Sequence, residues 1–293
     1  MLEFGHQFFH RHVLAHPYAL IDAAWRDELP LHWNCLAVAP SFLGNDLSRC
    51  PVLIDINSLA THEAGALMDS LNVQVAARED TVCSLLLHSK STLREVAKHL
   101  GSRIAIHWPS ESSPKQFRFF DPGSFLQLPQ VLGEEGMSWL LGPISSVLVP
   151  WAGQWTFASN ERSNGAGFRL NADHREALLL MGAVNRVAMQ LEPPESAAAW
   201  VDQAERIRGH LKRALFQYGL VQQDDLVAFG LHACKWHPFF DKHPLVADLM
   251  VKLRNVKPED ELDYRELTAR LNADDWAKVQ SELPPIKQGK NFS

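Results

Sequence analysis

Hydrophobic positions along the chain change their period near residue 170. Before that point, short and largely apolar runs alternate with segments of helical period, and these runs are Tyr18–Ile21, Pro51–Ile56, Val82–Leu87, Arg103–Trp108 and Val147–Val149. Runs of this length, bounded by turn residues, are typical of buried strands. Because strands that alternate with helices form layered structures, we predict an N-terminal α/β lobe with a mixed sheet, in the α+β or α/β fold class.

Two helices are predicted between these strands. The segment from Leu59 to Leu71 places its apolar residues on one helical face. A second helix is expected after Thr92, because Thr92 and Glu95 have the spacing of a capping box. Gly101 follows the last apolar residue of this helix, and a glycine there commonly ends a helix.

The apolar positions after Asn171 recur at helical spacing, which predicts an all-α C-terminal lobe over residues 171–283. The longest helix is expected over 197–218, where apolar residues alternate in steps of four and three before Gly219. Other helices are expected to begin after Asp224 or Asp225, at Pro244, and after Asp263 and Asp274.

A polar and glycine-containing stretch from Ser159 to Gly167 predicts a linker between the two lobes. The first lobe is therefore assigned to residues 1–160. The polar segment 284–293 follows two prolines, and we expect a frayed tail there.

The segment from Phe117 to Phe120 is rich in strand-forming aromatics. Alternation along a strand would place Phe117 and Phe119 on one face and Arg118 and Phe120 on the other. This strand is expected to form a hairpin with the strand predicted over 103–108.

The next residues predict a sharp corner that leads into a helix. Asp121 stands where an N-cap is needed, and Pro122 stands at the first helical position. Pro129 is expected to end or kink this helix early. Gly142 and Pro143 then predict a second turn before the next strand.

Composition narrows the class of protein. The chain is 46% hydrophobic and 21% charged, which is typical of a folded protein and excludes wholesale disorder. The net charge of −6 argues against a general nucleic-acid-binding protein. Four scattered cysteines, with no C-x-x-C pair, indicate a reducing compartment without a disulfide framework.

The N-terminal stretch does not have the pattern of a signal peptide, because His and Arg interrupt its apolar residues. No apolar run approaches the ~20 residues of a membrane-spanning helix. We therefore expect a cytoplasmic protein with no membrane span.

Catalytic signatures such as G-x-S-x-G, the P-loop and H-E-x-x-H are absent from the sequence. One cluster is a candidate ligand or catalytic site: Asp22, Asp55 and Asp121 with Arg118. All four residues lie near predicted strand ends, where ligands bind in open α/β sheets. The alternative is structural, because a partly buried Arg118 needs a partner and Asp22 or Asp55 would serve. We favour the structural alternative and expect no catalytic residue here.

Histidines form two further groups. His232, His237 and His243 accompany Asp241, but their spacing resembles no strong metal motif, and a helix–helix corner capped by Asp241 is favoured. Near the N-terminus, histidines recur at i, i+4 spacing without a completing carboxylate or cysteine, at His6, His10, His12 and His16. We expect no metal site and no cofactor.

Large aromatic residues gather at the end of the α/β lobe: Trp139, Trp151, Trp155 and Phe157. Aromatics of this size are either core residues or interface anchors. Because these four bracket turns, we expect them to contribute to a groove between the two lobes that clamps a segment of a partner protein.

The motif FRFFDP at 117–122, followed by an apolar helix, LLGPI and a tryptophan-rich strand pair, resembles the bacterial type VI secretion effector-chaperone (adaptor) family. That family is built on a widespread domain of formerly unknown function. Supporting segments are Tyr18–Asp22, Leu93–Leu100 and Phe239–Leu245, so the resemblance spans roughly residues 17–253. The chain departs from the family pattern at three positions: Gly123 replaces a usual basic residue, Phe120 a frequent Tyr, and Gly101 a frequent Arg.

The resemblance implies a cytoplasmic chaperone or adaptor that binds a cognate secreted effector, often through the N-terminal region of the effector. Such a protein helps to load the effector onto the spike protein of the secretion machine and is not itself exported. Its partners would be the effector and the spike, with no nucleic acid. Two alternatives remain: a small hydrolase-like enzyme that uses the Asp/Arg cluster, and an immunity protein that neutralises a toxin.

Overall fold

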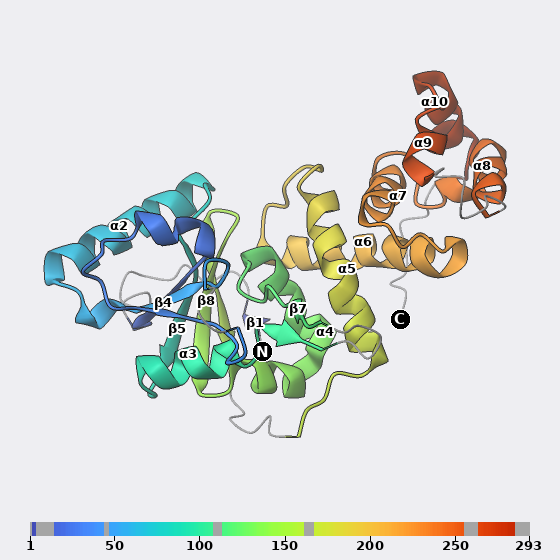
Figure 1. Ribbon diagram of the computed structural model, residues 1–293. Coiled ribbons are helices and arrows are strands. Elements are labelled where there is room, and N and C mark those ends of the chain that lie inside the picture. Colours follow the sequence, from blue (N-terminus) through green and yellow to red (C-terminus); the bar gives the residue numbers. More distant parts are fainter. Residues whose placement is uncertain are drawn as a thin grey trace. The chain divides into compact units, whose positions relative to one another are not determined.

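The computed structural model describes residues 2–3, 15–43, 47–107, 113–160, 167–254 and 263–284. The chain divides into two compact units (Figure 1): the first is Met1–Leu179 with Pro193–Asp202, and the second is Leu180–Glu192 with Gln203–Ser293. Helices α5 (Ala172–Ala188) and α6 (Ala197–Tyr218) each contribute residues to both units. The domain boundaries predicted from the sequence stay predictions, since residues 161–166 of the predicted linker lie outside the described residues.

A seven-stranded sheet forms the centre of the first unit, with the strand order β1-β9-β8-β5-β2-β4-β3. The strands are β1 (Leu2–Glu3), β2 (Tyr18–Ile21), β3 (Cys35–Ala37), β4 (Val52–Asp55), β5 (Cys83–Ser89), β8 (Ile144–Trp151) and β9 (Gln154–Ser159). An N-terminal sheet with helices, followed by a helical region, confirms the predicted fold class.

The described strands pair only in antiparallel fashion, whereas the sequence suggested a mixed sheet. The cause is the position of β2. Strands β4 and β5 are connected by helix α2 (Thr61–Ala77) and run in the same direction, but β2 lies between them and pairs antiparallel with both. The order of strands in a sheet is set by long-range packing, which a local pattern does not contain.

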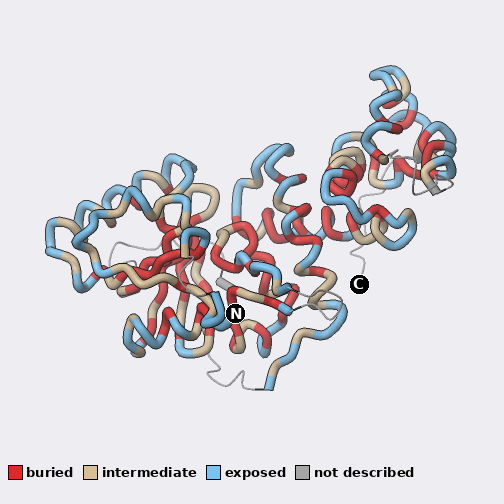
Figure 2. The backbone as a smooth tube through the Cα atoms, in the orientation of Figure 1, coloured by how far each residue is buried: buried red, intermediate tan, exposed pale blue. Residues whose placement is uncertain are grey.

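Buried residues dominate the central strands (Figure 2), and the strand registers place them on both faces of the sheet. On one face, Ala19, Leu86 and Leu148 pack with Met68 and Leu71 of α2. The opposite face carries buried residues from the same strands, including Leu20, Leu53, Leu87 and Val147. Contacts of α3 (Leu93–Gly101) with β3 and β4, and of α4 (Pro122–Leu141) with β8, place these helices on that second face (Figure 1).

Helix α3 begins as predicted but ends for a different reason. The Thr92 backbone N–H donates to Glu95 Oε2 at 2.8 Å, and Thr92 Oγ1 accepts from the Glu95 N–H at 3.4 Å, which completes the capping box. Gly101 is the last residue of the helix rather than a stop beyond it. A Cβ at Gly101 would lie 2.3 Å from the Ala39 carbonyl oxygen, so the glycine allows two backbones to approach closely.

The predicted strand over Phe117–Phe120 was wrong, because Phe117 and Arg118 have no regular structure and Phe119 and Phe120 form a turn. The strand β7 is Lys115–Gln116, which pairs with β6 (Ala105–Ile106) in a short hairpin. The Asp121 N–H then donates to the Arg118 carbonyl at 3.2 Å and closes the turn. All three phenylalanines are buried, and a turn makes this possible because strand alternation would have sent Phe119 and Phe120 to opposite faces. Trp108 lies outside the described residues.

Helix α4 follows the corner with Asp121 as its N-cap and Pro122 in its first turn, as predicted. The helix passes through Pro129 and is interrupted at Gly133, whose backbone angles are φ 65° and ψ −176°. Only glycine adopts this conformation readily, so the break falls there and not at the proline. Gly142, with φ 53°, ends α4 before β8, in agreement with the predicted second turn.

The second unit consists of helices around an aromatic centre that includes Phe229, Phe240 and Tyr264. Besides α5 and α6, its helices are α7 (Gln223–Lys235), η3 (Phe240–Lys242), α8 (Pro244–Arg254), α9 (Tyr264–Thr268) and α10 (Ala273–Glu282). The predicted bounds of α6 are correct, and Gly219 follows it with φ 69°. No helix within the described ranges is both long and apolar enough to cross a membrane.

Two predicted caps in this unit were wrong. Gln222 precedes α7, so Asp224 and Asp225 lie in the first turn of the helix and do not cap it. Their negative charges are stabilised there by the positive end of the helix dipole. Asn272, rather than Asp274, caps α10, and its side chain accepts the Asp275 N–H at 3.0 Å.

Gly101→Ala is expected to lower the free energy of unfolding by about 1–3 kcal/mol, because its methyl group would overlap the Ala39 carbonyl oxygen. Urea denaturation followed by tryptophan fluorescence measures the change. The matched control is Gly65→Ala on α2, where nothing lies within 4 Å of an added Cβ. That control should gain about 0.5–1 kcal/mol from helix propensity alone, and equal effects of the two substitutions would contradict the close backbone contact.

Candidate functional site

The three aspartates of the predicted Asp/Arg cluster all lie at the start of a helix. Asp22 precedes η1 (Ala23–Glu28), Asp55 precedes η2 (Ile56–Ser58), and Asp121 precedes α4. Each carboxylate accepts a backbone N–H two or three residues further on, from Ala24 (3.0 Å), Asn57 (3.0 Å) and Ser124 (2.7 Å). These bonds satisfy helix donors that have no partner within the helix itself, which is a structural task.

Arg118 contacts Asp22, one of the two partners considered for it. Its Nη2 lies 2.8 Å from Asp22 Oδ2, and the guanidinium stands 5.5 Å from the centre of the Phe120 ring. The sequence suggested a partly buried cation, and the Arg118 side chain is 59% exposed. An ion pair exposed to this extent contributes at most about 1 kcal/mol. The pair fastens the end of β2 to the corner across the outside of the unit.

Gly123, where the sequence departs from the pattern of the family it resembles, has little room for a side chain. Its carbonyl oxygen accepts the indole N–H of Trp200 at 2.9 Å and the side-chain amide of Gln127 at 3.0 Å. A Cβ at Gly123 would meet Trp200 at 3.3 Å and Trp151 at 3.4 Å. The two indole rings, 5.0 Å apart, therefore close the space above this glycine.

The four aromatics predicted to bind a partner lie in different surroundings. Trp155 is a core residue of the first unit, and its indole N–H donates to Asn72 Oδ1 at 3.1 Å. Phe157 packs against the same cluster, while the Trp139 ring lies 5.6 Å from the Phe168 ring at an angle of 42°. Trp151 pairs with Trp200 as described, and a partner-binding role for these residues and for a groove between lobes stays a prediction.

The second predicted cluster is divided among separate partners. His232 Nδ1 lies 2.7 Å from the Tyr264 hydroxyl, His237 Nε2 lies 3.1 Å from the Pro284 carbonyl oxygen, and His243 Nε2 lies 3.0 Å from Glu282. Within the part of the chain that the structure describes, no group of three or more His, Cys, Asp or Glu side chains is arranged to bind a metal. His6, His10 and His12 lie outside the described residues, and His16 Nε2 lies 3.0 Å from the Ser146 hydroxyl.

Asp241 does not cap a helix, contrary to the prediction, but forms the centre of a buried polar network. Its side chain has no exposed surface, Arg213 Nη2 lies 3.0 Å from one carboxylate oxygen, and the Tyr218 hydroxyl donates to the other at 2.6 Å. The Arg213 guanidinium stands 5.5 Å from the ring centres of both Phe229 and Phe239. A buried carboxylate requires such partners, because leaving it unpaired costs several kcal/mol.

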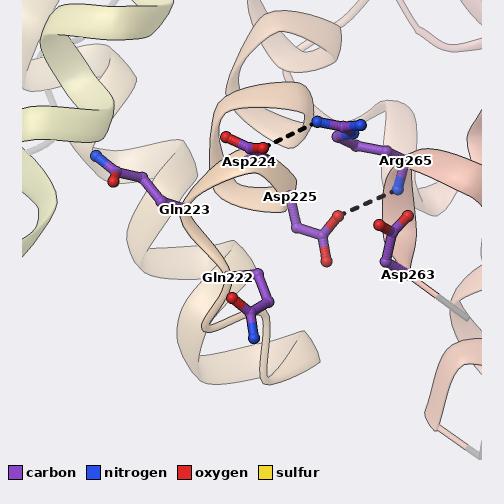
Figure 3. A pocket seen from close by; sticks show the side chains of 6 residues that line it. All are labelled: Gln222, Gln223, Asp224, Asp225, Asp263 and Arg265. Atoms are coloured by element: carbon purple, nitrogen blue, oxygen red, sulfur yellow. Dashed lines mark hydrogen bonds and ion pairs between the residues drawn. The ribbon is translucent and has the colours of Figure 1, made fainter. Parts of the chain in front are cut away.

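A shallow polar pocket lies in the second unit where α7 begins and α9 begins (Figure 3). It is lined by Gln222, Gln223, Asp224, Asp225, Asp263 and Arg265. Asp224 pairs with Arg186 at 2.7 Å and with Arg265 at 3.0 Å, while Asp225 accepts the backbone N–H of Arg265 at 3.2 Å. Burial raises the pKa of Asp225, and the carboxylate of Asp263, which points toward it in Figure 3, acts in the same direction. Asp263 itself caps α9, so the charged groups of this pocket are engaged with one another.

Three of the exposed apolar side chains lie in the segments that precede and follow the edge strand β3 in the sequence. Leu31 is fully exposed, and Phe42 and Leu43 are 57% and 37% exposed. The sequence pattern did not single out these residues, because they lie in polar or irregular stretches with no strand or helix period. The sequence signal that could have identified them is a bulky apolar residue in a segment without helix or strand periodicity, because such a residue is not expected to be buried.

Asp121→Ala is expected to lower the free energy of unfolding by about 1 kcal/mol, because the Ser124 N–H loses its acceptor. Asp121→Asn keeps an accepting side-chain oxygen and should stay within a few tenths of a kcal/mol of the unsubstituted protein. Urea denaturation compares the two variants. Equal losses for alanine and asparagine would contradict the capping role and return Asp121 to the list of charge-dependent site residues.

Stability should fall as the pH is lowered from about 6.5 toward 4. Burial lowers the pKa of His210 and of His232 to about 4, against about 6.5 in an unfolded chain, so the unfolded state binds more protons in this window. The urea midpoint measured between pH 7.5 and pH 4.5 reports this slope. The double variant His210→Gln/His232→Gln should flatten it, whereas His62→Gln at an exposed position on α2 should not. An unchanged slope in the double variant would contradict the burial of neutral imidazoles.

Comparison with known protein families gives one match. Residues 17–138 match the family described as "Domain of unknown function (DUF4123)". The matched segment runs from the residue before β2 into α4, so it contains the Phe117–Pro122 corner and β3 but ends before Gly142 and the β8–β9 pair. No curated protein and no solved structure gives a match to the chain.

Proposed function

We propose that the protein is a chaperone or adaptor that binds a cognate type VI secretion effector and assists its loading onto the spike protein. The observation that carries the proposal is the structural use of the Asp/Arg cluster. Asp22, Asp55 and Asp121 each cap a helix, and Arg118 pairs with Asp22 on the surface. The FRFFDP corner is therefore a scaffold, as expected of a binding protein whose recognition surface lies elsewhere.

The resemblance of the sequence to effector chaperones gives the proposal its partner class. The matched family itself has no assigned function, so the effector and the spike protein enter here as proposals. An effector segment that is apolar needs protection from water before it is handed over. The exposed Leu31, Phe42 and Leu43 offer apolar contact of the kind that such a segment requires.

The enzyme alternative needs carboxylates that are available to a substrate. A general acid or base must reach the proton that it transfers, at about 2.6–3.2 Å, while its other bonds leave it free to change protonation. Each of the three carboxylates already accepts a backbone N–H, and the positions they occupy are the starts of three different helices. We therefore propose a non-enzymatic role.

Co-expression with the toxin encoded beside it tests this function. We expect a stable complex through the N-terminal region of the toxin, and deletion of the chaperone gene should abolish export of that toxin while leaving other effectors unaffected. Affinity purification and a secretion assay measure the two outcomes. A toxin that is exported normally and forms no complex would overturn the proposal, and protection of a sensitive cell by the chain alone would indicate an immunity protein instead.

A further inference from the structure

We infer that the free edge of β3 receives an extended segment of the effector as an added strand of the sheet. This inference rests on the proposed function and names the site and the backbone geometry of binding. The strand β3 (Cys35–Ala37) is the last strand of the sheet and has one neighbour, β4, among the described residues. Its outer side is an edge at which another strand can pair.

The ladder between β3 and β4 fixes which backbone groups face outward. The pairs are Cys35 with Ile54, Leu36 with Leu53, and Ala37 with Val52. The Val38 N–H donates to the Pro51 carbonyl at 2.8 Å, so the pair 38–51 is hydrogen-bonded. Hydrogen-bonded and non-bonded pairs alternate in an antiparallel ladder, so Leu36 bonds to Leu53 and the backbone groups of Cys35 and Ala37 point away from β4.

The ladder on the other side of β4 supports this assignment. The Ile56 N–H donates to the Pro17 carbonyl at 2.7 Å, so the pair 17–56 is hydrogen-bonded. Alternation along the ladder then makes Ala19–Ile54 and Ile21–Val52 hydrogen-bonded pairs as well. Leu53, between these two β4 residues, therefore directs its backbone groups toward β3, where Leu36 receives them. Both ladders thus leave the same two residues, Cys35 and Ala37, with N–H and C=O groups directed outward.

The composition of this edge does not protect it. Edge strands are limited in their pairing by short length, charged residues or proline. The strand β3 has three residues, so it offers few pairing groups, but Cys35, Leu36 and Ala37 include neither a charge nor a proline. The flanking loops carry the exposed Leu31, Phe42 and Leu43. An edge without charge or proline can pair with a short extended segment of another chain.

The loop before β3 is fastened rather than loose. The Trp33 indole N–H donates to Glu63 Oε1 at 3.1 Å, and His32 Nε2 lies 2.5 Å from the same oxygen. Glu63 also accepts the Ala60 N–H at 3.2 Å at the start of α2. These bonds lower the pKa of Glu63 to about 2, with the Trp33 bond as the largest cause, so its carboxylate stays charged at neutral pH. Leu31 is therefore exposed on a loop that the His32 and Trp33 bonds to Glu63 anchor to the start of α2, directly before β3.

The occupant follows from the chemistry of the edge. Outward N–H and C=O groups that alternate along a strand pair with extended backbone, since a helix has already used its own groups. Main-chain hydrogen bonds do not depend on the side chains of the incoming strand. Apolar side chains of that strand would contact Leu31, Phe42 and Leu43. We therefore assign the edge to a short, extended and apolar segment of the N-terminal region of the effector.

Ala37→Pro tests the edge directly. Proline removes the outward N–H of Ala37 and leaves the bonds of Leu36 to β4 in place, because the Ala37 N–H does not face β4. Isothermal titration with the N-terminal region of the neighbouring toxin should show binding weakened roughly tenfold or more. The matched control, Ala37→Ser, keeps the N–H and should bind within about threefold of the unsubstituted chain.

Amide exchange measured by NMR gives a readout that does not depend on the proline. In the free chain the Leu36 amide should be protected, and the Cys35 and Ala37 amides should exchange rapidly. In the complex the latter two should become protected. A complex that forms while these amides stay unprotected, or that tolerates Ala37→Pro, overturns the inference and leaves the proposed function standing.

Two other outcomes are also decisive. Protection of Cys35 and Ala37 in the free chain that rises with protein concentration would assign the edge to a second copy of the chain and would overturn the effector assignment. Failure of the unsubstituted chain to bind the toxin at all would overturn the proposed function, and this inference with it.

Discussion

Three phenylalanine rings must be buried within four residues at the corner 117–120, and this requirement shapes the chain on both sides. Each buried ring contributes roughly 1.5–3 kcal/mol, against at most about 1 kcal/mol for the exposed pair of Arg118 with Asp22. The turn that buries all three rings delivers Asp121 to the start of α4, where it becomes the cap. Arg118 is the residue of the corner that remains outside, so it pairs on the surface. Apolar burial thus decides the geometry, and the polar groups adapt to it.

The same constraint explains why the conspicuous polar residues are a poor guide to function. Capping and pairing occupy Asp22, Asp55 and Asp121 of the first unit, and in the second unit Asp241 forms a buried ion pair with Arg213. Charged side chains that already have hydrogen-bond or ion-pair partners stabilise one conformation and have few groups left to bind a ligand. What remains available is backbone and apolar surface, and both occur together at β3 and its loops. This pairing of an edge strand with apolar loops is the basis of the proposed binding role.

Local signals in the sequence predicted local structure well. The Thr92–Glu95 capping box, the Asp121–Pro122 start of α4 and the period of α6 all depend on neighbours within a few residues, and all are correct. Local reasoning still misplaced the caps of α7 and α10 by a few residues, and long-range packing decided the larger failures. Insertion of β2 between β4 and β5 made the sheet antiparallel, Gly101 proved to be a contact point with Ala39, and burial turned Asp241 from a supposed cap into an ion-pair partner. The edge at β3 was also missed, because the sequence contains no record of which strand lies last.

The position of the edge has a consequence for specificity. β3 and the corner lie inside the segment that matches the family of unknown function, whereas β8, β9 and Trp151 lie beyond it. Backbone pairing along an edge is the same for any extended partner, so affinity from main-chain bonds does not by itself distinguish one extended segment from another. Discrimination must come from side chains beside the edge, and Leu31, Phe42 and Leu43 are the exposed apolar residues there. The loops on either side of β3 would therefore set which segment is accepted, while the strand itself sets how that segment is held.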